Sequence, residues 1–217
     1  LACDVLVLAV KPQDMRKALE PLRTRLEAQL VVSIAAGLRI VDVTRWLGGH
    51  AQVVRAMPNT PALIGAGIAG LYAPQQVDAE GRARAEAVLA AVGATVWVDD
   101  EALLDPVTAL SGSGPAYVFY FIEALEQAGT ALGLAAADAR KLAIHTVLGA
   151  ARLAASSDDP PATLRERVTS KGGTTEAALK VFAAEAIAER IGRALKAASS
   201  RGAELGAQLG CDPGSRD

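Results

Sequence analysis

The sequence has few of the side chains that build metal sites and nucleophilic catalytic centres. Its 217 residues include only two cysteines and two histidines, at Cys3, Cys211, His50 and His145. The two cysteines lie near opposite ends of the chain without the spacing of metal ligands, so we predict no metal site and a reducing, cytoplasmic location. So few histidines also disfavour a histidine-built metal centre or a Ser-His-Asp triad.

An excess of one charge and a long apolar run are also missing. The formal net charge is −2, and 21% of the residues are charged. There is therefore no basic surface of the kind that binds nucleic acid or an anionic membrane, and neither is predicted as a partner. The longest apolar run, residues 116–125, contains Glu123 and is too short to span a bilayer. Because 51% of the residues are hydrophobic, the chain has ample material for a globular core.

A third absence concerns nucleotide binding. No G-x-G-x-x-G turn follows a strand pattern, although such a turn normally holds the pyrophosphate in a doubly wound nucleotide-binding domain. The sequence also begins at Leu1, a few residues before its first strand pattern. We therefore expect a chain that lacks the N-terminal strand–helix units of a larger domain. A naturally small sheet is the alternative interpretation.

The first half of the chain alternates strand and helix patterns. Apolar strand patterns occur at residues 4–10, 30–34, 52–57, 65–73 and 95–98. Helical patterns lie between them at residues 12–26, 40–47 and 79–92. This alternation is typical of a parallel sheet built from βαβ units.

The second half contains helical patterns alone. These occur at residues 103–110, 116–132 and 138–155 and then from Leu179 onward, with a break at residues 111–115. The predicted fold class is α/β plus all-α. A partial Rossmann-like parallel sheet is expected in residues 1–101 and an all-helical domain in residues 102–217. The last helix is amphipathic, and it can pack within the chain or against a second copy.

The most informative segment is residues 167–179, with the sequence RVTSKGGTTEAAL. Gly172 and Gly173 stand directly before a helical pattern, where they allow a tight turn and a close approach of a ligand to the backbone. The first N–H groups of a helix are unpaired and carry partial positive charge. The segment therefore predicts a site for a small anion. A plain loop with a threonine helix cap is the alternative, and local chemistry alone favours neither.

Five segments, taken in order, resemble the pyrroline-5-carboxylate reductase family. They are AVKP at 9–12, SIAAG at 33–37, RAMPNTP at 55–61, LSGSGPAY at 110–117 and VTSKGGTT at 168–175. Each segment alone is a weak signal, but their order and spacing across essentially the whole chain are specific. The resemblance implies hydride transfer from NADPH (or NADH) to the imine carbon of 1-pyrroline-5-carboxylate, which yields L-proline. Lys171 departs from the family, since many members have proline there.

The resemblance also implies which residues form the site. Cofactor contacts are expected where the parallel strands end, at Ala9, Val10, Lys11, Pro12, Ala35, Ala36, Gly37, Pro58 and Asn59. Substrate contacts are expected at Glu101, Ser170, Gly172, Gly173, Thr174 and Thr175. Thr175 is the expected catalytic residue, because its hydroxyl can bond the ring nitrogen. The N–H groups of residues 173–175 would bind the substrate carboxylate. Taken alone, the same positions are also compatible with plain turns and a solvated glutamate.

The resemblance further implies a homodimer formed through the helical domain, and in some members a ring of dimers. Two alternatives remain open. One is another Rossmann dehydrogenase of the 3-hydroxyacid type, which would need a catalytic lysine such as Lys141. The other is a non-catalytic dimerising fragment. Because the glycine-rich turn is absent, we expect this chain by itself to bind NAD(P)H weakly.

Overall fold

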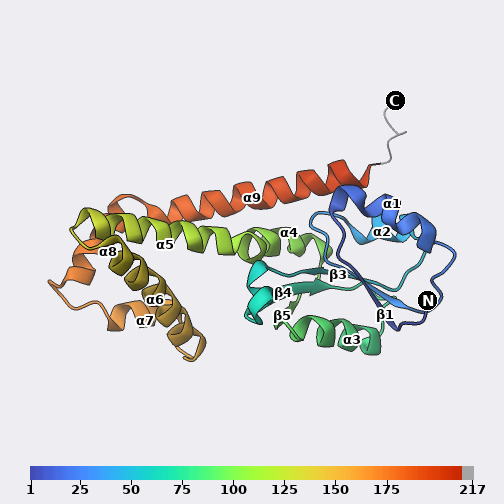
Figure 1. The fold of residues 1–217 in the computed structure, drawn as a ribbon, viewed down its shortest axis with the longest axis horizontal. Coiled ribbons are helices and arrows are strands. Elements are labelled where there is room, and N and C mark those ends of the chain that lie inside the picture. The colour runs from blue at the N-terminus through green and yellow to red at the C-terminus, as the bar shows by residue number, and fades with distance from the viewer. Residues whose placement is uncertain (212–217) are drawn as a thin grey trace. The chain divides into compact units, whose positions relative to one another are not determined.

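The computed structural model describes residues 1–211, which form two compact units (Figure 1). The sheet unit consists of Leu1–Pro115 together with the residues from Ala194 onward, and the helical unit consists of Ala116–Arg193. The sequence placed a domain boundary after residue 101, where strand patterns stop. The compact sheet unit continues to Pro115, because the helix that follows residue 103 packs on the sheet.

The sheet unit contains one five-stranded sheet. Its strands lie in the order β1 (Val5–Leu8), β2 (Leu30–Ser33), β3 (Val53–Met57), β4 (Gly67–Tyr72) and β5 (Gly93–Trp97). β1, β2 and β3 are parallel to one another, and β4 is parallel to β5. β3 and β4 are antiparallel, which the sequence did not predict. Only the 3-10 turn η3 (Thr60–Ile64) and its flanking residues join them, a connection too short for a parallel crossover.

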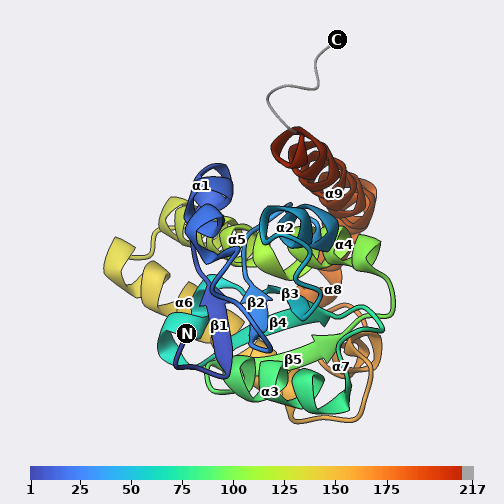
Figure 2. The same cartoon turned by 90° about the vertical axis from the view of Figure 1, so that its right-hand side faces the viewer.

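Helices cover both faces of this sheet (Figures 1 and 2). One face carries α1 (Met15–Leu19), α2 (Ile40–Trp46) and the end of α9 (Ile187–Gly210), and the other carries α3 (Ala79–Ala90). Val31 and Val53 enter the core below α1 and α2, whereas Val32 and Val54 enter the core beside α3. This period of two follows from the pleat of a strand. Because both faces of the sheet are covered, β2 and β3 are mostly apolar, with Ser33 and Arg55 as their buried polar residues.

The helix expected at residues 12–26 is shorter than its pattern. It consists of the 3-10 turn η1 (Pro12–Asp14), α1 and the 3-10 turn η2 (Glu20–Leu22). Pro21 lies in η2, where it lacks an N–H group for an α-helical hydrogen bond and ends α1.

The chain stays helical through the break expected at residues 111–115. The 3-10 turn η4 (Glu101–Leu103) leads into α4 (Leu104–Val107), then a π-helical turn η5 (Thr108–Gly112), then α5 (Gly114–Ala131). The Thr108 hydroxyl donates to the Leu104 carbonyl at 2.6 Å, and the Ser111 hydroxyl donates to the Val107 carbonyl at 2.9 Å. Such bonds compete with the regular backbone ladder and bend helices. The hydroxyl residues that suggested a break therefore reshape the helix instead.

The helical unit contains most of α5, then α6 (Ala136–Ala155), α7 (Pro161–Arg167), α8 (Thr174–Ala184) and the start of α9. α7 was not predicted; it begins with Pro161, a residue suited to the first helical position. The helix expected from Leu179 onward is interrupted between α8 and α9. There Ala186 has a φ of 51°, and it is the one residue other than glycine with positive φ in residues 1–211.

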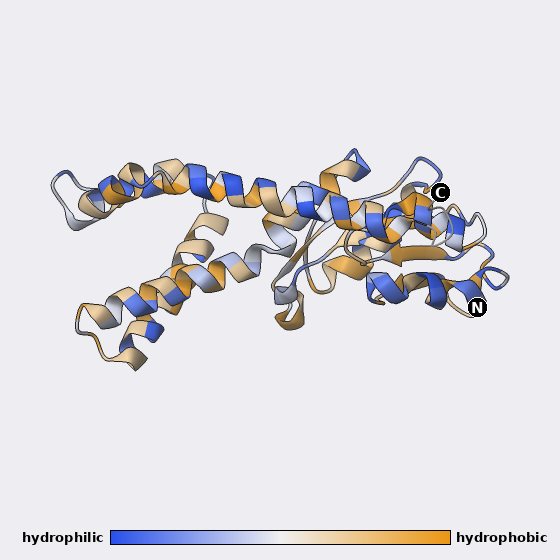
Figure 3. Ribbon diagram, turned by 90° about the horizontal axis from the view of Figure 1, so that it is seen from above, coloured by the Kyte–Doolittle hydropathy of each residue, from blue (hydrophilic) through white to orange (hydrophobic). Residues whose placement is uncertain are grey.

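Few apolar side chains are buried within the helical unit. Among residues 116–193, the buried hydrophobic residues are Ala139 and Ala143. Hydrophobic residues recur along its helices (Figure 3). Larger apolar side chains among them stay exposed, including Phe119 at 64% and Phe182 at 45%. None of the helices in residues 1–211 is long and apolar enough to cross a membrane. The unit thus has helices with apolar surfaces but almost no core of its own.

Candidate functional site

One candidate site, within the sheet unit, is the edge of the sheet where β1, β2 and β3 end. The predicted cofactor residues Ala9–Pro12, Ala35–Gly37 and Pro58–Asn59 follow these three strands. Because the strands are parallel neighbours, their carboxyl ends lie at one edge. The Ile34 N–H donates to the Leu8 carbonyl at 3.2 Å and joins the first two turns. The structure therefore brings the predicted cofactor turns together.

These turns offer hydrogen-bond donors to a ligand. Within the described part of the chain, the N–H groups of Val10, Lys11 and Ala36 donate to no acceptor. Lys11 and Ala36 are exposed, whereas the buried Ala35 directs its N–H toward the Ser33 hydroxyl at 3.5 Å. Backbone donors need partners. Small side chains with open N–H groups and a lysine therefore fit the phosphate-bearing part of a nucleotide.

Asn59 has a second role that the sequence did not indicate. Its Nδ2 donates to the Ser111 carbonyl at 3.1 Å, and its Oδ1 accepts from the Ile68 N–H at 3.0 Å. The side chain thereby joins the end of β3 to β4 and to the π-helical turn. No pattern could have shown this, because Ser111 is 52 positions away. Its contact with a cofactor stays a prediction.

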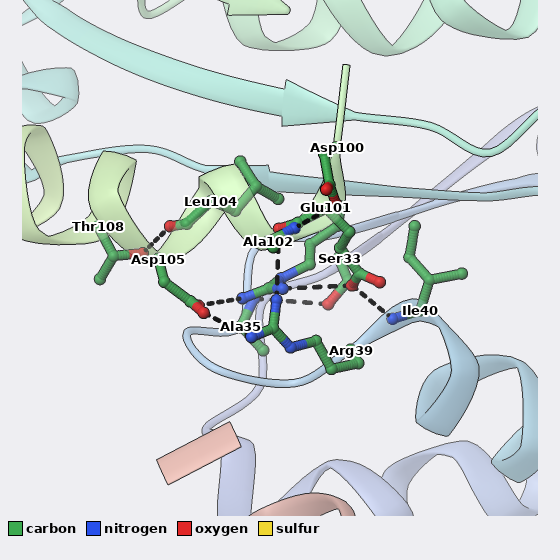
Figure 4. Close-up of polar contacts among 11 residues, drawn as sticks. Ser33, Ala35, Arg39, Ile40, Asp100, Glu101, Ala102, Leu104, Asp105 and Thr108 are labelled. Carbon is green, nitrogen blue, oxygen red and sulfur yellow. Dashed lines mark hydrogen bonds and ion pairs between the residues drawn. The ribbon is translucent and has the colours of Figure 1, made fainter. Parts of the chain in front are cut away.

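Four charged side chains form a network beside this edge (Figure 4). Arg55 of β3 pairs through Nη1 with Glu101 Oε1 at 3.2 Å, and its Nη2 lies 3.9 Å from Asp105 Oδ1. Arg39 at the start of α2 pairs with Asp105 Oδ2 at 2.5 Å and donates to the Glu101 carbonyl at 3.3 Å. Arg55 is 2% exposed and Asp105 is 7% exposed. Two cations and two anions balance here, with Arg55 and Asp105 buried and the Arg39 and Glu101 side chains partly exposed.

Glu101 has a structural role in this network. Its Oε1 accepts a hydrogen bond from the Ile40 N–H at 2.8 Å. Ile40 is the first residue of α2, and the residue before it, Arg39, makes no side-chain cap. Glu101 therefore caps α2 from 61 positions away, at the helix end where negative charge is stabilising. Its predicted contact with substrate stays a prediction.

The network also determines the electrostatics of Arg55. Burial lowers the pKa of the Arg55 guanidinium, while the neighbouring Glu101 and Asp105 carboxylates raise it and Arg39 lowers it further. A buried charge is tolerated when it is paired and hydrogen-bonded. Loss of one carboxylate would leave two guanidinium groups facing a single anion.

Another candidate site lies within the helical unit, in the loop before α8. Gly172 has a φ of 75°, which favours glycine. Its N–H donates to Glu176 Oε2 at 2.7 Å, and the Gly173 N–H donates to the Ser170 carbonyl at 3.0 Å. The first regular helical bond is made by the Ala177 N–H to the Gly173 carbonyl. Gly173, expected to donate to the substrate, is therefore engaged within the loop.

The backbone N–H groups that stay open belong to the three residues after Gly173. Among the residues that the structure describes, the N–H groups of Thr174, Thr175 and Glu176 meet no acceptor. Thr175 is half-buried, and its hydroxyl has no hydrogen bond to residues 1–211. Three unpaired N–H groups at the positive end of an eleven-residue helix are suited to hydrogen bonding with a small anion.

The loop geometry shows the structural roles of Ser170 and Gly173, two of the predicted substrate residues. A Cβ at Gly173 would lie 2.6 Å from the Ser170 hydroxyl oxygen, so the serine packs where a side chain would otherwise be. The Glu176 carboxylate lies beside the open donors, but Lys180 Nζ is 3.4 Å from it and offsets part of its charge. Ser170 and Gly173 therefore shape the loop, whereas Thr174 and Thr175 present donors.

Comparison with known proteins supports this interpretation of the fold. A family model for pyrroline-5-carboxylate reductase dimerisation matches residues 101–205, and one for NADP oxidoreductase, coenzyme F420-dependent, matches residues 1–37. The chain is 51% identical to the pyrroline-5-carboxylate reductase of Pseudomonas aeruginosa over 95% of this chain and 76% of that protein. The relative from Synechocystis is 44% identical over 94% of this chain and 75% of its own length.

Solved structures of the same family are similar to this fold. A pyrroline-5-carboxylate reductase from Coxiella burnetii superposes with a TM-score of 0.90 at 44% identity, over 94% of this chain and 77% of that one. The pyrroline carboxylate reductase of Plasmodium falciparum, solved with NADP bound, gives a TM-score of 0.86 at 30% identity, over 94% of this chain and 78% of that one.

The mostly parallel sheet and the helices that follow it define an oxidoreductase of the Rossmann type with a helical dimerisation domain. Within that class, the chain belongs to the pyrroline-5-carboxylate reductase family. The predicted fold class and the family resemblance are confirmed. The alternatives, a dehydrogenase of the 3-hydroxyacid type and a non-catalytic fragment, are not favoured.

The ion network leads to a stability prediction. Replacing Asp105 by asparagine keeps the side-chain volume but removes one buried anion, so Asp105→Asn should lower the free energy of unfolding by about 3 kcal/mol. Urea titration followed by circular dichroism measures the loss. Asp100→Asn is the matched control, because Asp100 is exposed and its carboxylate accepts a hydrogen bond from the Ala102 N–H outside the ion network. That change should stay within about 0.5 kcal/mol of the wild type. Equal losses in the two variants would contradict the network's role.

Proposed function

We propose that this protein reduces the imine of 1-pyrroline-5-carboxylate to L-proline, with NADPH or NADH as hydride donor. The observation that carries the proposal is the loop before α8, with open N–H groups at Thr174, Thr175 and Glu176. This loop lies in a chain whose curated relatives, matched over about three quarters of their length, are pyrroline-5-carboxylate reductases.

The residues that would hold the cofactor are those at the ends of β1, β2 and β3. The open N–H groups of Val10, Lys11 and Ala36 suit polar groups of a dinucleotide, and the exposed Lys11 side chain adds a positive charge. Ala9, Pro12, Ala35, Pro58 and the buried Gly37 complete the proposed set, and Asn59 fixes the third turn. When bound, the reduced nicotinamide supplies the hydride. The Plasmodium falciparum relative solved with NADP supports this choice of cofactor.

The substrate would bind at the loop before α8. Its carboxylate would accept hydrogen bonds from the N–H groups of residues 174–176, at the positive end of the helix. The Thr175 hydroxyl would bond the ring nitrogen, with Ser170, Gly172 and Gly173 holding the loop in shape. A protonated imine is already electrophilic, so the protein's main task is alignment. This requirement is consistent with a chain that contains only two histidines.

A homodimer is part of the proposal, with rings of dimers as a further assembly. The helical unit cannot bury its own apolar side chains, and it has an apolar groove of about 670 Å³. Leu179, Phe182, Ile187 and Ile191 are among the residues that line this groove. Exposed apolar surface of this extent marks an interface, and the dimerisation family model covers the same residues. Exposed free thiols at Cys3 and Cys211 support a cytoplasmic location.

The role of Thr175 is tested in the full-length protein by following NAD(P)H oxidation with pyrroline-5-carboxylate. Thr175→Ala removes a hydrogen bond to a charged ring nitrogen, so kcat/KM should fall about 30-fold, equivalent to about 2 kcal/mol. Thr24→Ala, at an exposed position in the sheet unit, should leave kcat/KM unchanged. Absence of turnover in the wild type would reject the proposed reaction, and full activity of Thr175→Ala would reject the role of Thr175.

The dimer is tested by placing a charge in the apolar groove. Phe182→Glu should convert the protein into a species of half the mass, because a carboxylate in an apolar interface lacks a partner. Light scattering coupled to size-exclusion chromatography reads the mass directly. Leu63→Glu is the control, since Leu63 is 90% exposed in the sheet unit and the charge should not change the mass. A Phe182→Glu protein that keeps the wild-type mass would show that this groove is not the interface.

A further inference from the structure

The end of α9 makes backbone-to-backbone contact with the turn that follows β2. Gly37 in that turn has a φ of 82°, and a Cβ built on it would lie 3.2 Å from the Gly206 nitrogen. A Cβ on Gly206 would in turn overlap the Gly37 carbonyl oxygen. Both glycines are buried, and both belong to the sheet unit. The contact is possible because neither residue has a side chain.

The next turn of α9 is anchored to α2. The Gly210 carbonyl accepts a hydrogen bond from Arg45 Nη2 at 2.6 Å, and Arg45 also pairs with Asp42 at 2.9 Å. A Cβ on Gly210 would overlap the Asp42 carboxylate, and Leu209 packs against the core below α1 and α2. The end of α9 is therefore fixed at two positions. Gly206 packs on the turn after β2, and Gly210 is held by α2, the helix that follows this turn.

The turn thus lies between two rigid supports. On one side, Arg39 and the Ile40 N–H tie the start of α2 to Glu101 and Asp105. On the other side, Gly206 of α9 lies directly against Gly37. The open Ala36 N–H belongs to the residue directly before Gly37. Closely packed interiors transmit small displacements, so any shift of α9 at Gly206 displaces the turn.

We propose that Gly206 is a positioning residue for the cofactor: the α9 backbone sets the place of the turn at Ala35–Gly37 and thereby the affinity for NAD(P)H. The inference rests on the proposed function, which assigns this turn to the cofactor. Glycine is a poor residue for a helix interior, and the close approach to Gly37 explains its presence at position 206. A misplacement of about 1 Å in a binding group is enough to reduce binding and rate strongly.

The experiment compares two glycines of α9 in the full-length protein. Gly206→Ala places a methyl group against the Gly37 carbonyl, whereas Gly202→Ala places it in open space with no atom within 4 Å. Both changes raise helix propensity equally. Fluorescence titration gives the Kd of NADPH, and steady-state assays give separate KM values for NADPH and for pyrroline-5-carboxylate. Circular dichroism and the mass in solution verify the fold.

Gly206→Ala should raise the Kd and KM of NADPH about tenfold and change the KM of pyrroline-5-carboxylate less than twofold. Gly202→Ala should match the wild type in all three constants. Wild-type NADPH affinity in Gly206→Ala would overturn the proposal, as would an equal rise in both KM values. A wild type that binds NADPH without reducing pyrroline-5-carboxylate would reject the proposed reaction, while the titrations would still test Gly206.

A second variant covers the case in which Gly206→Ala does not fold. Arg45→Gln keeps all glycines but removes the charged hydrogen bond to the Gly210 carbonyl, so the last turn of α9 is held less firmly. The Kd of NADPH should then rise about threefold, with the KM of pyrroline-5-carboxylate unchanged. An unaltered Kd of NADPH in Arg45→Gln would overturn the proposal independently of the first variant.

Discussion

The buried pairing of Arg55 with Glu101 and Asp105 is the interaction on which the sheet unit depends most. A guanidinium group that is 2% exposed is stable only beside compensating anions. β3 carries the cation, and the chain after β5 carries both anions, so the strand and the start of α4 are held together. Arg39 extends the same pairing to α2. One network of charges thereby fixes three elements that are distant in sequence.

The proposed cofactor turns after β1–β3 and the loop before α8 leave backbone groups accessible in similar ways. At both places glycine or alanine leaves the main chain accessible, and N–H groups stay open where a ligand would bind. At both places a packed neighbour shapes the turn. The Ser170 side chain packs where a Cβ of Gly173 would be, and α9 supports Gly37. The side chains of these turns serve mainly to shape the backbone, which explains why a chain with two histidines can still form such a site.

Much of this structure could be predicted from the sequence, since continuous apolar runs located the strands and short motifs located the turns. The remaining features depend on contacts that local patterns do not contain. Arg55 and Glu101 are 46 positions apart, and nothing in either segment shows that they meet. The antiparallel β4 follows from a short connection. The break at Ala186 lacks the glycine or proline that usually marks a helix end. In the loop before α8, the Gly173 N–H is engaged by the Ser170 carbonyl. The donors that stay open are therefore those of residues 174–176 and not of residues 173–175.

We propose that the backbone at the start of α8 holds the substrate carboxylate while the turns after β1–β3 hold the cofactor. A crystal structure of the full-length protein with NADP⁺ and L-proline tests it most directly. We expect the proline carboxylate within hydrogen-bonding distance of the Thr174, Thr175 and Glu176 N–H groups. We expect the nucleotide against Val10, Lys11 and Ala36. A carboxylate bound to side chains elsewhere, with those three N–H groups still open, would contradict it.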